Sequence, residues 1–495
     1  MKKIYSFISV IIFCFLSDLT LKAEQNLKDK LNNSIVLITT TYQVPSFYDP
    51  WRWNPANTKS GQGIIIAPNM VLTLADNVKN ATLIQVTINT EPVPANMKIK
   101  AIDLNSNLAL LEGVLPKNAK PVTISKISAF NKNDDVKFFW KNDQGTLMGG
   151  TAMLERIEAR YLSNASIQPQ TVHRAIRSSY PNLSFGVPVF DKNDNFYGLA
   201  LRGGTEYEFS ILTADIINRV FNLKTCTKNT PTAIAGFKTA PLTQVYFRKK
   251  LGLTMQDGGC LISKVYEQGS GIDQIKSGDV LIEVDGKKLD PWGKYENSSH
   301  EMIYFKHLFA NHYITETMPI TIIRKKKKLN INLKLASIDD NKWLIPRNLE
   351  KKQIPYLIRG GFAFIPMTLS FLQEWGNRFM DNGPLALIES FSQNKYKIKT
   401  NECNELIILA RVLPHPSNIG LQSLGNTVIS KVNGENLKNL TQLKEILDCN
   451  KNKIVKFSLA PGDIPLWVNS DSLKNADQDI KMQYGIDKLE HFTQE

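Results

Sequence analysis

Histidine and cysteine are scarce in this chain of 495 residues, which has six of the first and five of the second. Cys14 lies in an apolar run near the N-terminus, and the others are far apart: Cys226, Cys260, Cys403 and Cys449. Clusters of these residue types at short spacing are the usual signature of a zinc site. None is present, so we expect neither a metal site nor another cofactor. The spacing leaves open whether the four later cysteines form disulfides.

The histidines are also placed unevenly, because none precedes residue 173. The six are His173, His300, His307, His312, His415 and His491. Those at 300, 307 and 312 fall in a segment that we expect to be helical, where their spacing does not put them on one face. We interpret them as ordinary polar residues and not as metal ligands.

Long apolar runs are absent apart from Ile4 to Leu16, which is shorter than the roughly 20 residues that a membrane-spanning helix needs. Lys2 and Lys3 precede this run, and a polar stretch ending in Ala23 follows it. That layout is typical of a secretory signal peptide. We therefore expect residues 1–23 to be removed, the protein to be exported to the periplasm, and no membrane span to remain.

Acidic residues are fewer than basic ones, 46 against 60, which gives a formal net charge of +14. The excess favours anionic partners without naming one. The densest basic run, Arg324 to Lys328, lies between two short β-patterned segments, 320–323 and 329–335. We interpret it as a solvated hairpin tip, and we expect no nucleic-acid partner in an exported protein.

Short β-branched runs separated by turn residues fill the chain from Asn33 to about Leu223, which is typical of a barrel or sandwich. The runs are 34–41, 63–66, 70–74, 84–88, 108–111 and 187–190, and a helical pattern follows at 211–221. We expect one domain at 24–225 and a linker at 226–232.

Two later units, 233–340 and 355–461, are weak repeats of each other. Each opens with a Gly-aromatic segment, Ala235-Gly236-Phe237-Lys238 in one and Gly361-Phe362-Ala363-Phe364 in the other. Each later has an apolar strand that ends in a glycine turn, at 279–286 and at 427–434. The polar residues 462–495 predict a C-terminal tail with at most one short helix near Ile480.

Three segments of the first unit stand in the order of the catalytic motifs of the HtrA/Deg serine proteases. The segment 61–78 resembles the strands that lead to the family's Thr-x-Ala-His motif, with Asp76 at the histidine place. The segment 103–111 is similar to Asp-x-x-x-Asp-Leu-Ala, with Asn107 at the place of the second Asp. The segment 183–191 resembles Gly-Asn-Ser-Gly-Gly-Pro-Val-Phe-Asp, with Phe185 at the serine place.

The resemblance covers most of the chain and is strongest in the second unit. That unit looks like the first PDZ domain of the Deg branch found in plants and many bacteria. The resemblance implies a mainly β fold, a trypsin-like double β-barrel followed by two PDZ domains, and a homo-oligomer.

The replaced residues do not support the chemistry that the family motifs imply. A serine is a poor nucleophile unless a neutral imidazole takes its proton, and Phe185 has no hydroxyl. Asp76 is a weak base, and Asn107 would orient a histidine that is absent. One alternative keeps an enzyme, if Ser184 is a register-shifted nucleophile and His173 is its base; otherwise Ser184 is a turn hydroxyl.

A PDZ domain holds a peptide carboxylate on the amides of a glycine-containing loop while the peptide extends a sheet. We expect Ala235, Gly236, Phe237 and Lys238 to form such a site, with Lys238 adding positive charge. Alternatively, Phe237 fills the core of its own domain. For residues 361–364 the resemblance favours packing between domains over peptide binding.

Aromatic residues are dense between residues 42 and 53, where Tyr42, Phe47, Tyr48, Trp51 and Trp53 fall within twelve residues. Exposed aromatic residues at that density indicate a contact surface. Packing of this loop against its own barrel is the other interpretation, and the sequence does not choose between them.

Two functions from different classes follow. The first is a periplasmic pseudoprotease that binds unfolded proteins or peptide C-termini, as a holdase, an adaptor or a regulator. The second is an active Deg-type serine endopeptidase that uses displaced catalytic residues. A purely structural subunit would show neither cleavage nor peptide capture.

Overall fold

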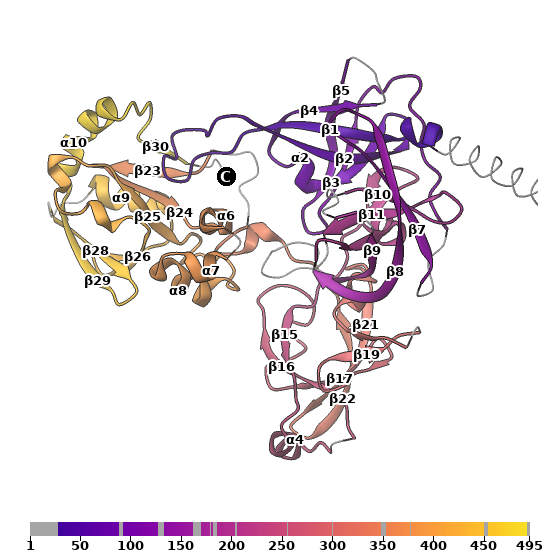
Figure 1. Cartoon of the computed structure of the whole chain (residues 1–495). Helices are drawn as coiled ribbons and strands as arrows, with labels where there is room; N and C mark the ends of the chain where they lie inside the picture. Colours follow the sequence, from indigo (N-terminus) through magenta and orange to yellow (C-terminus); the bar gives the residue numbers. More distant parts are fainter. Residues whose placement is uncertain are drawn as a thin grey trace, which may run out of the picture.

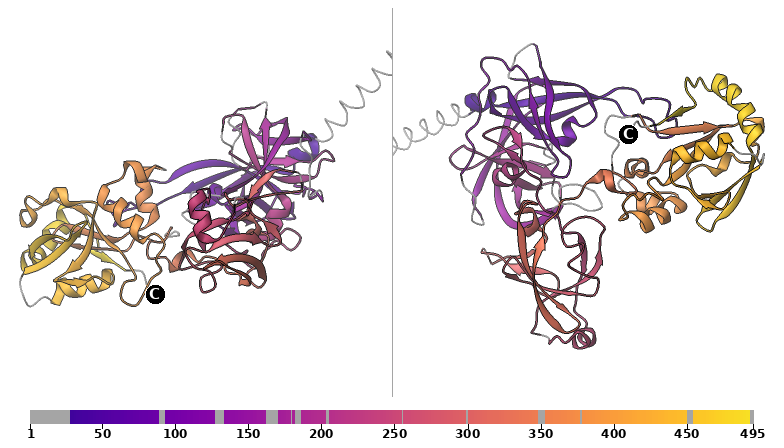
Figure 2. Two further views of the ribbon diagram at one scale, coloured as in Figure 1. Left: turned by 90° about the horizontal axis from the view of Figure 1, so that it is seen from below. Right: turned by 180° about the vertical axis from the view of Figure 1, so that it is seen from behind.

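The computed structural model describes residues 28–88, 93–126, 133–161, 170–178, 180–181, 186–202, 205–254, 256–298, 300–347, 353–376, 378–449 and 454–492. The expected signal peptide and the segment that contains Ser184 and Phe185 lie outside these residues. Figures 1 and 2 show three lobes: a double barrel, a unit that projects from it, and a C-terminal unit to one side.

The N-terminal barrel is a closed sheet with the strand order β1-β2-β3-β6-β5-β4. Its strands are β1 (Ile35–Tyr42), β2 (Asn57–Ala67), β3 (Met70–Leu74), β4 (Ala81–Thr87), β5 (Ala95–Asp103) and β6 (Leu108–Glu112). β3 is buried along its whole length, as its apolar residues, interrupted only by Thr73, predict. The short helix α2 (Ala75–Val78) follows β3 directly.

A second closed barrel has the order β10-β11-β12-β9-β8-β7. Its strands are β7 (Asp135–Lys141), β8 (Leu147–Tyr161), β9 (Gln170–Ser178), β10 (Pro188–Phe190), β11 (Phe196–Arg202) and β12 (Glu208–Thr213). Helix α3 (Ala214–Val220) and the pair β13 (Phe221–Asn222) and β14 (Thr227–Lys228) follow. The Gln62 amide joins the barrels, because it donates to the Lys141 carbonyl (2.8 Å) and accepts from the Lys141 amide (2.9 Å). The predicted double β-barrel is confirmed.

The second unit is a sheet with the order β15-β16-β17-β21-β22, so that β15 is an edge strand of the described sheet. Its elements are β15 (Phe237–Ala240), α4 (Val245–Leu251), β16 (Cys260–Val265), β17 (Val280–Val284), β18 (Lys287–Lys288), β19 (Lys294–Glu296), β20 (Met302–Tyr304), α5 (His307–Ala310), β21 (Thr317–Arg324) and β22 (Lys327–Lys334). Arg324 pairs with Lys327 across a turn at Lys325 and Lys326. The basic run is therefore a hairpin tip, as predicted.

The C-terminal unit has a sheet with the order β29-β28-β26-β25-β24-β23-β30. Its strands are β23 (Tyr356–Arg359), β24 (Phe362–Pro366), β25 (Ile407–Val412), β26 (Thr427–Val432), β27 (Glu435–Asn436), β28 (Ile454–Ala460), β29 (Ile464–Asn469) and β30 (Glu490–His491). The α-helices are α6 (Leu369–Leu372), α7 (Phe379–Asn382), α8 (Leu385–Asn394), α9 (Leu440–Cys449) and α10 (Ser470–Gln483). Short 3-10 helices are η1 (Asp340–Lys342), η2 (Gln373–Trp375), η3 (Pro416–Asn418) and η4 (Gln422–Leu424).

The expectation of a C-terminal tail from residue 462 was wrong. β29 pairs with β28, β30 pairs with β23, and α10 lies between them in sequence. Helix α10 buries Leu473, Ala476 and Ile480 because their spacing of three and four residues puts them on one face. Few apolar residues are therefore enough to attach this polar segment to the core.

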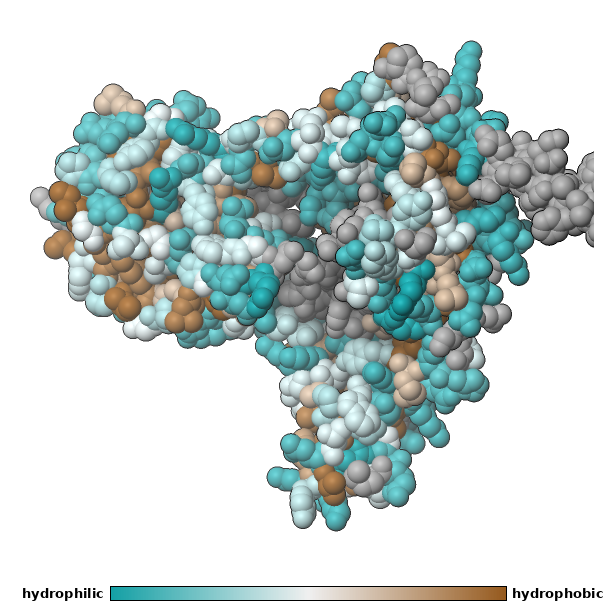
Figure 3. Space-filling view, in the orientation of Figure 1, coloured by the Kyte–Doolittle hydropathy of each residue, from teal (hydrophilic) through white to brown (hydrophobic). Residues whose placement is uncertain are grey.

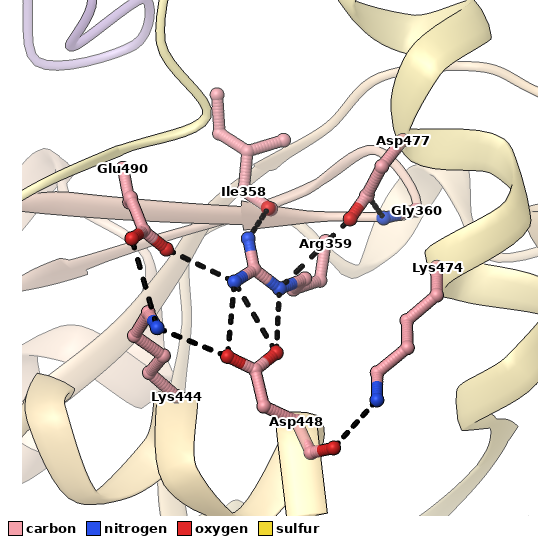
Figure 4. A network of polar contacts seen from close by, with 8 residues as sticks. All are labelled: Ile358, Arg359, Gly360, Lys444, Asp448, Lys474, Asp477 and Glu490. Atoms are coloured by element: carbon pink, nitrogen blue, oxygen red, sulfur yellow. Dashed lines mark hydrogen bonds and ion pairs between the residues drawn. The ribbon is translucent and has the colours of Figure 1, made fainter.

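An ion-pair network holds the same segment in place (Figure 4). The largely buried Arg359 guanidinium at the end of β23 donates to Glu490 (2.9 Å) and to Asp448 (3.3 Å), and lies 3.9 Å from Asp477 of α10. Lys444 also bonds Asp448 (3.0 Å). The network therefore connects β23, α9, α10 and β30.

The aromatic loop between β1 and β2 contacts the C-terminal unit of the same chain. Phe47 and Tyr48 contact the Phe371 ring, with centroids 5.7 and 6.0 Å away, and Trp51 packs on the same core. Arg411 adds an ion pair with Asp49 at 2.6 Å. Trp53 stays exposed, and the Tyr42 ring lies under the Lys59 ammonium at 4.8 Å. Part of the loop is therefore a contact surface within one chain.

Candidate functional site

The candidate site in the N-terminal barrel begins where β3 ends. The buried strand stops at Leu74, and α2 presents Asp76 to solvent with 56% of its side chain exposed. One Asp76 carboxylate oxygen bonds the Lys79 ammonium at 2.8 Å. The Lys59 ammonium, on β2, donates to the Asp76 carbonyl at 2.6 Å. The carboxylate therefore lies in a basic surrounding.

Asn107 lies directly opposite this carboxylate. Its amide nitrogen donates to the other Asp76 oxygen (3.0 Å), and its amide oxygen accepts from the Asp76 backbone N–H (2.9 Å). Its carbonyl also accepts from the Ala75 N–H (3.0 Å). Asn107 has φ of 54°, a left-handed conformation that asparagine adopts more readily than most residues. The structure thus brings together the two residues that the motifs place at the base and its orienting partner.

The Asp76–Asn107 pair contains one carboxylate but no imidazole that could act as a general base. Both Asp76 carboxylate oxygens already accept a bond, one from Asn107 and one from Lys79. Burial and the Lys79 ammonium lower the pKa of Lys59 to about 8, although the Asp76 carboxylate acts in the opposite direction. The Lys59 ammonium is in turn bonded to the Asp76 and Lys79 carbonyls.

The segment of the serine place returns to this region at Gly186. Gly186 has φ of 79°, and its amide donates to the Ala200 carbonyl at 2.9 Å. A Cβ at this position would lie 3.1 Å from the Leu74 side chain and 3.5 Å from the Asn77 amide nitrogen. Asn77 is the residue after Asp76, so the chain just past the serine place contacts α2.

His173, the alternative base, is enclosed in the second barrel. It lies on β9 with 1% exposure. Its Nε2 is 2.7 Å from the Thr171 hydroxyl, and its Nδ1 is 3.3 Å from the Ser210 hydroxyl. Both ring nitrogens therefore have hydroxyl partners inside the barrel wall.

In the second unit, the predicted peptide-binding residues surround the start of β15. Phe237 is fully buried and stacks on Phe305, with centroids 6.2 Å apart, so it fills the core of its own domain. The Gly236 amide donates to the Ser270 carbonyl (3.0 Å), and a Cβ on Gly236 would lie 2.8 Å from that oxygen. Ala235 is buried, whereas Lys238 is exposed on the edge strand.

In the C-terminal unit, the corresponding glycine loop is occupied by the same chain. The Gly360 amide donates to the Asp477 carboxylate of α10 at 2.7 Å (Figure 4). Gly360 and Gly361 have φ of 56° and 87°, and a Cβ on Gly360 would overlap Leu473 of α10 at 2.3 Å. This loop therefore binds a carboxylate of its own unit, a contact within the domain and not the packing between domains that the resemblance favoured.

The four later cysteines form no disulfide in this structure, and the histidines at 300, 307 and 312 have local partners. Cys226, Cys260, Cys403 and Cys449 are all free thiols, and burial raises the pKa of Cys260 to about 12. The predicted helix around the histidines is limited to α5, where His307 lies 2.9 Å from the Tyr295 hydroxyl. Within the described ranges no group of three or more His, Cys, Asp or Glu side chains could hold a metal. No described helix is long and apolar enough to cross a membrane.

Comparisons with known proteins add to this picture. Residues 345–490 match the PDZ domain family, a range that includes α10 and the first residue of β30. Protease Do-like 2, chloroplastic, of Arabidopsis thaliana is 21% identical over 464 residues, which cover 92% of this chain and 74% of that protein. Protease Do-like 4, mitochondrial, of the same plant is 23% identical over 450 residues, which cover 86% of this chain and 81% of that protein.

These similarities run through the double barrel and both later units. The chain belongs to the HtrA/Deg family. Among solved structures, an HtrA-type protease AlgW with decapeptide aligns with a TM-score of 0.45 at 14% identity, over 62% of this chain and 96% of that chain.

In this HtrA/Deg protein, two residues at the candidate site escaped the sequence analysis. Lys59 lies 17 residues before Asp76, and only the barrel pairing brings its ammonium to α2. Asn77 donates to the Thr73 hydroxyl at 3.0 Å and lies beside Gly186. Asn77 could have been found from its place next to Asp76 in the motif. No sequence pattern pointed to Lys59.

Proposed function

We propose that this HtrA/Deg protein is an exported, oligomeric pseudoprotease of the periplasm. It binds unfolded or C-terminal peptide segments through its first PDZ unit, as a holdase, an adaptor or a regulator. The observation that carries the proposal is the contact between Asp76 and Asn107, where the family motifs place a histidine and an aspartate.

The chemistry of this contact supports loss of proteolysis. Acyl transfer by serine requires a general base near neutral pKa beside the hydroxyl. The Asp76 side chain is shorter than an imidazole, and both of its carboxylate oxygens are engaged, one by Asn107 and one by Lys79. Phe185, at the serine place, offers no nucleophile at all.

Peptide binding is supported by the edge of the first PDZ unit. β15 ends the described sheet, so an extended peptide can add its own backbone hydrogen bonds there. Lys238 places a positive charge on this edge, opposite Lys264 of β16. The Gly236 amide already bonds Ser270, so the strand edge and the Lys238 charge contribute more than the loop amide.

The alternative is an active Deg-type endopeptidase that uses Ser184 and His173. The full burial of His173 between Thr171 and Ser210 favours the pseudoprotease, because a base must reach its nucleophile and the substrate.

The deciding experiment is cleavage of casein by the chain from Glu24, beside its Ser184→Ala and His173→Ala variants. We expect no turnover by any of the three. Turnover that either substitution abolishes would establish a rearranged active site and refute the pseudoprotease.

Capture is measured in the same preparation as anisotropy of a labelled unfolded peptide. We expect Lys238→Gln to weaken binding several-fold and the control Lys287→Gln, on β18 of the same unit, to leave it unchanged. Absence of both turnover and capture would leave a purely structural subunit.

A further inference from the structure

Helix α4 exposes three neighbouring apolar side chains at the end of the first PDZ unit that is farthest from the double barrel. Helix α4 leaves Val245, Tyr246 and Phe247 exposed by 43%, 87% and 37% of their surface. Such neighbouring aromatic and aliphatic side chains usually lie in a core or an interface. Figure 1 shows α4 at the far end of the projecting unit, away from the double barrel.

Lysines surround this helix. Lys249 and Lys250 continue α4, and the β21–β22 hairpin tip carries Lys325, Lys326, Lys327 and Lys328. A Cβ on Gly252, which caps α4, would lie 3.3 Å from the Lys326 side chain, so the helix and the hairpin tip are neighbours. All six lysines are exposed, and no ion pair within the described part of the chain includes any of them. We call Val245 to Phe247 and these six lysines the basic tip.

Hydrogen bonds of one buried arginine and a small apolar cluster hold the basic tip in place. Arg248, on the inner side of α4, is 1% exposed, and its guanidinium donates to the carbonyls of Leu242 (2.8 Å) and Thr254 (2.8 Å), and also to that of Asp257. These bonds tie both ends of the α4 loop to one group. Leu242 and Leu253 pack beneath it against Val280. The apolar side chains therefore stay exposed because the fold fixes α4 in this position.

We propose that the basic tip binds an anionic lipid surface. Exposed aromatic residues next to lysines have the composition of a membrane-interface element, in which apolar side chains enter the headgroup region and ammonium groups bind acidic headgroups. The tip projects at the end of an arm, as in Figure 3, where hydrophobic and strongly hydrophilic residues meet at the lower end of the molecule. Because the tip projects from the rest of the molecule, it can contact a flat, negatively charged surface. Its charge complements acidic lipids, and the excess of basic over acidic residues in the whole chain adds to the attraction.

Vesicle co-sedimentation tests the basic tip independently of cleavage or peptide capture. The chain from Glu24 avoids any contribution from the N-terminal apolar run, and the vesicles are phosphatidylcholine alone or mixed with phosphatidylglycerol. Lys325→Asn with Lys326→Gly removes two charges and suits the positive φ of 48° and 65° at these positions. Each lysine near an anionic surface contributes a factor of roughly five in affinity, so removal of this pair should weaken binding by roughly 25-fold.

Tyr246→Ser tests the apolar part, and two matched variants serve as controls. Lys117→Gln with Lys120→Gln removes two exposed lysines from the double barrel, and Val114→Ser removes an exposed apolar side chain there. We expect the tip variants to lose phosphatidylglycerol binding and the controls to keep most of it. An equal loss in the controls, equal binding to neutral vesicles, or binding to polyglutamate without binding to vesicles would overturn the proposal.

Discussion

Exchange of the two residues at the candidate site tests whether they form one structural pair. Asn107→Asp places a second carboxylate against Asp76, whose oxygen now lies 3.0 Å from the Asn107 amide nitrogen. Asp76→Asn combined with Asn107→Asp restores one amide and one carboxylate in exchanged positions. The single variant should lose stability near neutral pH, and the exchanged variant should regain most of it.

The magnitude follows from distance and exposure. Two unit charges 4 Å apart repel by about 1 kcal/mol in water and about 4 kcal/mol near a protein surface. Asp76 is 56% exposed and paired with Lys79, whereas Asn107 is buried, so we expect a loss of about 1–3 kcal/mol for Asn107→Asp. The exchanged variant loses the exposed Lys79 pair, which contributes about 0–1 kcal/mol.

The pH dependence has a definite sign. Repulsion raises the folded-state pKa of the new carboxyl above its unfolded value of about 3.9, so the cost is absent at low pH and grows as pH rises through that range. Asn107→Ala removes the acceptor of the Asp76 N–H and puts alanine in a left-handed conformation, and its cost of about 2–3 kcal/mol should not depend on pH in this way.

Urea unfolding at about pH 4 and pH 7.5, followed by circular dichroism, measures these differences. The reasoning is refuted if Asn107→Asp matches the natural chain at both pH values. It is also refuted if the exchanged variant is as unstable as the single variant at the higher pH.

Other predictions concern buried charge and contacts between units. Arg359→Met removes the cation shared by three carboxylates, of which Asp448 and Glu490 keep only Lys444. It should destabilise the C-terminal unit by about 2–4 kcal/mol, measured by hydrogen exchange in α10, whereas the exposed Arg378→Met should change it by less than about 0.5 kcal/mol. Burial lowers the pKa of Lys141 to about 8, so its charged form costs stability below that pH; any advantage of Lys141→Met over the natural chain should shrink between about pH 7 and pH 10 in paired urea titrations. Tyr48→Ala should loosen the contact with the C-terminal unit and speed proteolysis between the units, and Trp53→Ala, already exposed, should not.

Local sequence patterns predicted the strands whose burial follows from their own residues. The run from Met70 to Leu74 became β3 at those bounds, because four apolar residues and Thr73, whose hydroxyl donates to the Gln62 carbonyl, are all buried there. β8 was not predicted, since charged residues interrupt its apolar pattern. Those charges find partners along β8 and across the sheet. Arg156 bonds Glu158 of the same strand and Glu208 of β12, and Glu155 bonds Arg177 of β9 at 2.5 Å.

Contacts between distant segments were beyond the reach of local patterns. The motif resemblance brought Asp76 and Asn107 together, but their separation of 31 residues gave no independent sign of contact. The partner of the aromatic loop, Phe371, lies more than three hundred residues after Tyr48. Only the arrangement of the C-terminal unit beside the double barrel makes that contact.

The two later units differ in whether the glycine loop and the sheet edge are occupied by the same chain, and this difference supports the proposal that the first unit captures peptides. In the C-terminal unit, Asp477 already bonds the Gly360 amide, Leu473 fills the space above it, and the Arg359 network holds α10 there. An incoming carboxylate would have to displace this helix and leave Arg359 with fewer partners. In the first unit, β15 ends the described sheet and Lys238 is exposed on it, so a peptide strand can add without displacing a folded element.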